Sequence, residues 1–86
     1  MKTATLVIKN ETGLHARPAA TVINKAKEFE SKLTVRKGNK EVNLKSMISL
    51  LSLGICKGEE IHLTAEGSDE ETAIENLSAF ILELAD

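Results

Sequence analysis

The chain has 86 residues, of which 42% are hydrophobic and 28% charged, and its formal net charge is −2. Domains typically run to ~100–150 residues, so this length is enough for one small domain and too short for two. The composition excludes a disordered chain. No apolar run approaches the ~18–20 residues that cross a bilayer, and the first nine residues lack a signal-peptide core. We therefore expect a soluble, cytoplasmic domain without membrane insertion.

Nucleic-acid binding and metal binding are both disfavoured. Nucleic-acid-binding proteins usually show a basic stripe, often with aromatic rings that stack on bases, whereas this acidic chain has two Phe and neither Tyr nor Trp. The single cysteine, Cys56, cannot form an intramolecular disulfide, and no Cys/His pair has metal-ligand spacing. We expect Cys56 to be a passive free thiol, and we expect no metal or cofactor. A deep pocket is also hard to line with one small core, so a carrier or docking module suits the size.

The first half of the chain predicts a strand and then a helix. Residues 3–9 alternate, with Ala4, Leu6 and Ile8 on one face, as in a half-buried strand. Residues 10–13 have turn composition. From residue 16, apolar side chains recur at helical spacing as far as Phe29, and Pro18 falls in the first turn, where it is tolerated.

The middle of the chain predicts a hairpin and a short helix. Residues 32–36 and 40–43 form the two strands, joined by a two-residue turn at Gly38-Asn39. Ser46 is placed to N-cap a helix over residues 47–53, and Gly54 is suited to ending it.

The last third predicts a strand and a final helix. Ile61, Leu63 and Ala65 alternate with His62 and Thr64, and Ser68 and Glu71 have the spacing of a capping box. The helix that follows buries Ile74, Leu77, Ile81 and Leu84. The order β-α-β-β-α-β-α predicts an α+β open-faced sandwich, in which three helices cover one face of a four-stranded antiparallel sheet.

The stretch Gly13-Leu14-His15-Ala16-Arg17-Pro18-Ala19-Ala20 is the most informative for chemistry. Pro18 places His15 at or beside the helix N-cap. The backbone N–H groups of Ala16 and Arg17 then form an anion site that the helix dipole strengthens. The Arg17 guanidinium suits phosphate oxygens, and neutral imidazole is a nucleophile. A solvated loop histidine beside an exposed arginine fits the local composition as well, so these residues alone leave the two interpretations open.

The same stretch resembles the active-site motif of HPr, the histidine-containing phosphocarrier of the bacterial phosphoenolpyruvate-dependent sugar phosphotransferase system. Val42-Asn43-Leu44-Lys45-Ser46, followed by Leu51-Ser52-Leu53-Gly54, resembles the second signature of that family, and Thr64-Ala65-Glu66-Gly67 its last strand and turn. The likeness covers essentially the whole chain, so residues 1–86 are expected to form a single HPr-like phosphocarrier domain with the open-faced sandwich fold.

The resemblance implies a relay. His15 would accept a phosphoryl group on Nδ1 from phosphorylated Enzyme I, which takes it from phosphoenolpyruvate, and would pass it to the A domain of a sugar-specific Enzyme II. Arg17 would neutralise the phosphate. Such a protein is a carrier within a relay rather than a stand-alone enzyme.

Ser46 has two interpretations that stay open. One is a helix N-cap only, worth about 1 kcal/mol. The other, implied by the resemblance, is a regulatory site phosphorylated by HPr kinase/phosphorylase, which would engage a catabolite-control transcription factor.

A docking surface for the partners is expected beside His15. Some apolar side chains of the short helix should remain exposed there, ringed by lysines that steer an acidic partner. The residues expected to take part are Ala20, Lys27, Met47, Ile48 and Leu51, with Lys45 nearby.

Two other functions compete with the sugar carrier. A purely regulatory HPr-like protein would act through Ser46, although the regulatory member of the family lacks the active histidine. A carrier of the nitrogen-related branch would use His15 identically with other partners. No large exposed apolar stripe is evident in the sequence, so a monomer is expected.

Overall fold

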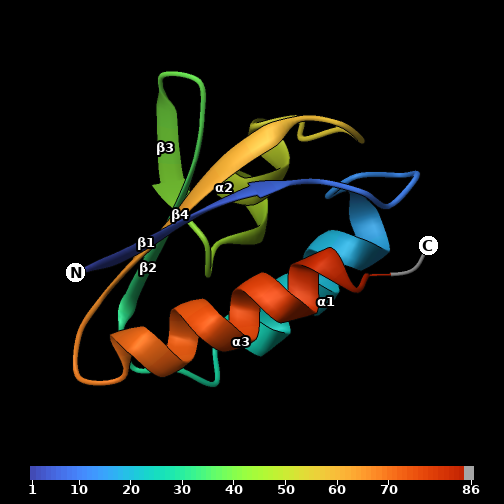
Figure 1. Cartoon of the computed structure of the whole chain (residues 1–86). Coiled ribbons are helices and arrows are strands. Elements are labelled where there is room, and N and C mark those ends of the chain that lie inside the picture. Colours follow the sequence, from blue (N-terminus) through green and yellow to red (C-terminus); the bar gives the residue numbers. More distant parts are fainter. Residues whose placement is uncertain (85–86) are drawn as a thin grey trace.

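The computed structural model describes residues 1–84 as one sheet covered by helices (Figure 1). In chain order the elements are β1 (Lys2–Val7), α1 (Ala16–Ala26), β2 (Lys32–Lys37), β3 (Lys40–Asn43), α2 (Met47–Ser52), β4 (Glu60–Glu66) and α3 (Glu70–Leu82). The strands form an antiparallel sheet in the order β1-β4-β2-β3, and α1 and α3 pack together along one face (Figure 1). The predicted open-faced β-α-β-β-α-β-α sandwich is confirmed.

Alternation along the strands decides which face of the sheet is covered. Ile61 and Leu63 of β4 are buried and stand opposite Leu6 of β1 and Val35 of β2, respectively, which are also buried. Because side chains of a strand alternate between faces, the intervening residues point to the other side. There His62 lies half-buried, and its Nδ1 is 3.0 Å from the Thr5 hydroxyl of the neighbouring strand.

The helices close the core with side chains three or four positions apart. In α1 the buried residues are Ala19, Val22, Ile23 and Ala26, and in α3 they are Ala73, Leu77 and Ile81. This spacing places one face of each helix on the sheet. Ile74 and Leu84, which were expected inside, are partly buried and pack against the edge of the core.

The hairpin and the short helix lie as predicted, to within one residue. Gly38 adopts φ +60° in the turn between β2 and β3. The Ser46 hydroxyl accepts a hydrogen bond from the Ser49 N–H at 3.3 Å and so caps α2. Helix α2 ends at Ser52 rather than at residue 53, and Gly54 follows with φ +59°. The positive φ lets the chain leave the helix at little steric cost.

Two sequence-based predictions at helix ends were wrong. Helix α1 stops at Ala26, so Phe29 lies in the turn beyond it, although its ring still packs against the core. The capping box at Ser68 and Glu71 does not form, because Asp69 is the N-cap residue of α3. Instead, the side chain of Glu70 accepts the Gly67 N–H at 3.2 Å.

The Asp69 carboxylate is engaged across the fold rather than in its own helix. It accepts the N–H groups of Glu30 at 2.8 Å and Ser31 at 2.9 Å, and it also accepts the Ser31 hydroxyl. The Ser31 hydroxyl and then the Glu30 N–H hold the pKa of Asp69 below its usual value. This carboxylate therefore ties the start of α3 to the segment entering β2.

Candidate functional site

His15 is the N-cap residue of α1 and has extended backbone angles, φ −117° and ψ 154°. Its ring makes no capping hydrogen bond and is half-buried at the rim of the molecule. The residue before it, Leu14, is fully buried, and its N–H donates to the Ile55 carbonyl at 3.0 Å. The histidine thus stands at the surface on a backbone that is anchored in the core.

A tight turn leads the chain into this position. The Gly13 N–H donates to the Asn10 carbonyl at 3.1 Å, and the Asn10 side-chain amide donates to the Gly13 carbonyl at 2.7 Å. Gly13 has φ +65°, and a Cβ there would lie 2.3 Å from the Ile55 carbonyl oxygen and 2.8 Å from Cα of Cys56. Only glycine allows this close approach, which seats the residues before His15 against residues 55 and 56.

The first turn of α1 is electrostatically positive. Arg17 is exposed two residues after His15, and the first turn contains no acidic residue. Within residues 1–84, no carboxylate forms an ion pair with Arg17. The backbone N–H groups of Ala16 and Arg17 have no acceptor within the helix, since they precede its first i to i−4 bond. An imidazole at the N-cap, an exposed arginine in the first turn and the positive end of a helix therefore belong to one short segment, a combination that suits an oxyanion such as phosphoryl.

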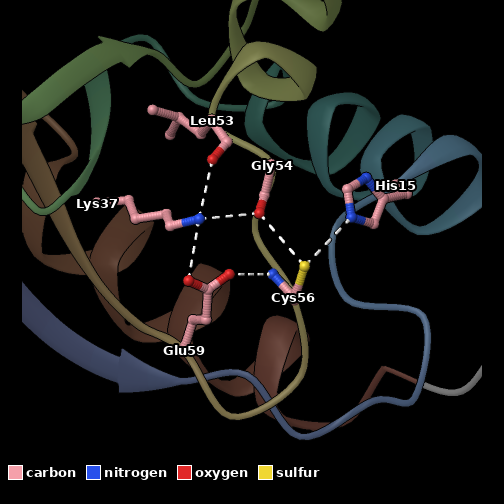
Figure 2. Close-up of polar contacts among 6 residues, drawn as sticks. All are labelled: His15, Lys37, Leu53, Gly54, Cys56 and Glu59. Atoms are coloured by element: carbon pink, nitrogen blue, oxygen red, sulfur yellow. Dashed lines mark hydrogen bonds and ion pairs between the residues drawn. The ribbon is translucent and has the colours of Figure 1, made fainter.

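The Cys56 thiol is not the isolated group that its sequence context suggests. Its Sγ lies 3.8 Å from Nε2 of His15 and 3.4 Å from the Gly54 carbonyl oxygen, so it stands directly beside the histidine ring (Figure 2). The side chain is exposed. Folding brings position 56 beside the start of α1, a proximity that the expectation of a passive free thiol did not include.

An ion pair holds the segment that contains Cys56. Lys37, at the end of β2, donates to the Leu53 carbonyl at 3.1 Å and the Gly54 carbonyl at 2.9 Å, and its Nζ is 2.9 Å from Glu59 Oε2 (Figure 2). The other carboxylate oxygen of Glu59 accepts the Cys56 N–H at 2.7 Å. The Lys37 ammonium and then the Cys56 N–H lower the pKa of Glu59. We call Lys37 and Glu59 the loop clamp, because together they fix residues 53–56.

Helix α2 presents apolar side chains next to α1, against which it packs. Ile48 is 84% exposed and Leu51 is 38% exposed, whereas Met47 is partly buried against the core. Leu50 is fully buried. Part of the short helix therefore stays exposed, as predicted, with Ile48 as its most exposed apolar side chain.

The lysines expected around this surface have different surroundings. Lys27 is exposed but lies at the C-cap of α1, the opposite end of that helix from His15. Lys45 is committed to the fold, because its Nζ donates to the Phe29 carbonyl at 2.7 Å. Ala20 is half-buried, one turn into α1.

Residues 1–84 offer neither a metal site nor a membrane-spanning helix. No cluster of three or more His, Cys, Asp or Glu side chains in this part of the chain is arranged to hold a metal ion. None of the helices in the same residues is both long and apolar enough to span a membrane.

The family of the chain follows from comparison with known proteins. A family model described as the PTS HPr component phosphorylation site matches residues 2–83. This chain belongs to the HPr family of phosphocarrier proteins. The resemblance seen in the sequence is thereby confirmed for nearly the whole chain.

Relatives of this HPr-family chain include both carrier and HPr-like proteins. The HPr-like protein Crh of Halalkalibacterium halodurans is 47% identical over 74 residues, which are 86% of this chain and 88% of that protein. A crystal structure of HPr from Thermoanaerobacter tengcongensis is 51% identical, with a TM-score of 0.92, and the match covers 94% of this chain and 91% of that one. A crystal structure of Bacillus subtilis Crh, a swapped dimer, is 40% identical with a TM-score of 0.78, and the match covers 96% and 95% of the two chains.

Local sequence reveals the two candidate residues of this HPr-family site that lie close together in the chain, but not their surroundings. His15 and Arg17 are two residues apart, so a short motif reveals both. Cys56 and the loop clamp, in contrast, are separated from His15 by 22 residues or more along the chain. No periodicity or turn signal connects them, and only the antiparallel sheet brings the loops together.

Proposed function

We propose that His15 accepts a phosphoryl group on Nδ1 from phosphorylated Enzyme I and passes it to the A domain of a sugar-specific Enzyme II. The observation that supports this most directly is the position of His15, a half-buried N-cap residue at the positive start of α1, followed by the exposed Arg17. A phosphoryl group on the ring would meet the guanidinium and the N–H groups of Ala16 and Arg17. Residues 1–86 would act as one cytoplasmic carrier domain.

The shallow placement of His15 suits transfer between two proteins. Each partner must bring its own reacting group within bonding distance of the ring, so a deep pocket would obstruct the exchange. Ile48 and Leu51 offer exposed apolar area on α2, and the half-buried Ala20 lies on α1, the helix against which α2 packs. Exposed apolar side chains of this kind are common at the centre of docking surfaces. We propose that these residues and Met47 contact the partners, with Lys27 contributing charge from the periphery.

Intact-mass measurement after mixing the protein with phosphoenolpyruvate and Enzyme I tests the carrier proposal. One added phosphoryl group is expected, removable by acid and absent from His15→Ala. His62→Ala is the matched control, because His62 is the other histidine of the chain and lies on the open face of the sheet. The proposal would be excluded if His15→Ala were still phosphorylated. It would also be excluded if the wild type were not phosphorylated by an Enzyme I that is active on another carrier.

A regulatory role through Ser46 is the second candidate, favoured by the similarity to Crh proteins. Ser46 is half-buried and caps α2, two residues from the exposed Ile48. A phosphate on this serine would lie at the N-terminal end of α2, where negative charge is tolerated, and would add about −1.5 to −2 charges beside the docking residues. Acid-stable phosphorylation by an HPr kinase/phosphorylase with ATP, lost in Ser46→Ala, would support this role, and binding of a catabolite-control transcription factor would be its consequence.

We propose that the carrier works as a monomer. The exposed large apolar side chains in the described residues are Met1, Val7, Ile48, Leu51 and Leu82, and they are spread over β1, α2, α3 and the chain start. Because the Crh structure from Bacillus subtilis is a swapped dimer, the assembly needs its own measurement. Size-exclusion chromatography with light scattering should give the molecular mass of one chain. A stable mass of two chains would refute the monomer.

A further inference from the structure

The Cys56 thiol lies between the His15 ring and the backbone carbonyl of Gly54 (Figure 2). These two neighbours differ in whether they can donate a hydrogen bond to the sulfur. Its Sγ is 3.8 Å from Nε2 of His15 and 3.4 Å from the Gly54 carbonyl oxygen. A carbonyl oxygen only accepts hydrogen bonds, whereas a thiol has one hydrogen to donate and lone pairs that accept weakly. The thiol hydrogen is therefore directed at Gly54, and sulfur presents its lone pairs to the imidazole.

This arrangement favours one tautomer of the neutral histidine. A sulfur acceptor beside Nε2 stabilises a hydrogen on that nitrogen, and a neutral imidazole has only one N–H. Nδ1 is then left with an available lone pair. We propose that Cys56 is a positioning residue that holds His15 in the Nε2–H tautomer and so leaves Nδ1 as the nucleophile.

The rest of the loop keeps the sulfur in place. The Cys56 N–H is bound by the Glu59 carboxylate at 2.7 Å, and the Gly54 carbonyl is bound by the Lys37 ammonium at 2.9 Å. On the other side, the Leu14 N–H bonds to the Ile55 carbonyl at 3.0 Å. Because both the thiol and the histidine backbone are fixed by separate hydrogen bonds, their contact does not depend on a mobile side chain finding its partner.

The role of this tautomer in phosphoryl transfer rests on the proposed function of His15. In the step itself, the lone pair of Nδ1 forms the new bond to phosphorus. The bond from phosphorus to the donor atom of Enzyme I breaks, and its electron pair stays with the donor. The hydrogen on Nε2 remains on the ring, so the phosphorylated imidazole is positively charged beside the sulfur lone pairs until water takes that proton.

Nitrogen-15 NMR on the unphosphorylated protein tests the tautomer directly, without any partner. The protein is labelled at histidine, kept reduced and measured at a pH where both histidines are neutral, and two-bond correlations distinguish the N–H from the bare nitrogen. We compare the wild type with Cys56→Ala, which removes the acceptor, and Cys56→Ser, which restores a hydroxyl acceptor. His62 is an internal control, since its ring contacts Thr5 and Glu60 instead.

The wild type should show His15 mainly as the Nε2–H form. Cys56→Ala should lower the ratio of Nε2–H to Nδ1–H by about two- to threefold, as expected for a weak hydrogen bond. Cys56→Ser should recover most of that change, and the His62 signals should not move. A wild-type Nδ1–H form, or an unchanged ratio in Cys56→Ala, would overturn the proposal.

Transfer kinetics separate this inference from the function on which it rests. The initial rate of phosphorylation by Enzyme I should fall in Cys56→Ala in proportion to the fraction of His15 in the Nε2–H form, which is a smaller factor than the change in the tautomer ratio. The thermal unfolding midpoint should stay unchanged. A tautomer shift in a protein that Enzyme I never phosphorylates would support the Cys56 contact and refute the carrier function. A loss of rate with an unchanged tautomer would refute the positioning role and leave the carrier function intact.

Discussion

Replacing Gly13 by alanine should destabilise the protein much more than the same change at Gly38. The two glycines have nearly equal backbone angles, φ +65° and φ +60°. A left-handed conformation costs a non-glycine residue roughly 1–2 kcal/mol, so both variants should share this loss. A Cβ at Gly38 meets nothing within 4 Å, whereas one at Gly13 lies 2.3 Å from the Ile55 carbonyl oxygen. The overlap is with backbone, which has to move.

The size of the difference follows from the cost of such a shift. Forcing extra atoms into a packed region costs typically 1–3 kcal/mol, so Gly13→Ala should lose about that much more unfolding free energy than Gly38→Ala. For a domain of this size, each kcal/mol lowers the melting temperature by about 4–8 °C. Far-UV circular dichroism is the suitable probe, since the chain has neither Trp nor Tyr.

The two glycine variants should also differ in the rate at which His15 is phosphorylated. The displaced backbone includes residues 55 and 56, so Gly13→Ala should slow phosphorylation of His15, while Gly38→Ala should leave its rate unchanged. Equal unfolding free energies for the two variants, to within about 0.5 kcal/mol, would refute the reasoning, because that is the usual range of surface substitutions without a specific cause. The close approach at Gly13 would then have no structural importance.

Three further predictions concern docking, capping and pH. Ile48→Ser should change the unfolding free energy by no more than about 0.5 kcal/mol yet slow phosphorylation by Enzyme I, whereas Leu50→Ala should lose about 2–5 kcal/mol in urea unfolding. Ser46→Ala should lose about 1 kcal/mol through the missing cap, and Ser46→Asp should keep the stability but reduce the phosphorylation rate by Enzyme I. The Ser31 hydroxyl and the Glu30 N–H lower the pKa of Asp69 in the folded protein. The contribution of Asp69 to the free energy of unfolding is therefore complete above its unfolded-state pKa, about 3.9, and is lost as the pH falls through the lower folded-state pKa. Melting temperatures from pH 7 to pH 2 should therefore fall less steeply at the acid end in Asp69→Asn than in the wild type.

The fold could be predicted because its signals are periodic and local. Alternation in residues 61–65 specifies which face of β4 is buried, and the helical spacing in α3 specifies the face that packs on the sheet. The capping arrangement at the N-terminus of α3 could not be predicted in the same way. Asp69 gives up the capping role that its position offers and binds Ser31, 38 residues earlier in the chain. Tertiary hydrogen bonds of this kind override a local motif without leaving a sequence pattern.

The candidate site likewise combines residues that local sequence reveals with residues that only tertiary contacts bring together. His15 and Arg17 follow from one short segment and from the rule that helix N-termini attract anions. Cys56 was interpreted as a passive free thiol because a single cysteine has no intramolecular disulfide partner and no Cys/His pair has metal-ligand spacing. Its contact with His15 spans 41 residues and arises from the pairing of the two loops at one end of the sheet. That proximity exists only in the folded chain.

The two residues proposed to carry phosphate are both N-cap residues of helices. A phosphate at such a position should affect partner binding without affecting the stability of the fold. His15 is the N-cap of α1 and Ser46 is the N-cap of α2, and the two helices pack together. Negative charge at a helix N-terminus is stabilising, so a phosphate on either residue leaves the core and the sheet as they are. Its effect falls instead on the partner that approaches, because Arg17 and Ile48 are both exposed next to these caps. A small domain can therefore carry charge at either cap while its stability rests on a core that neither phosphate reaches.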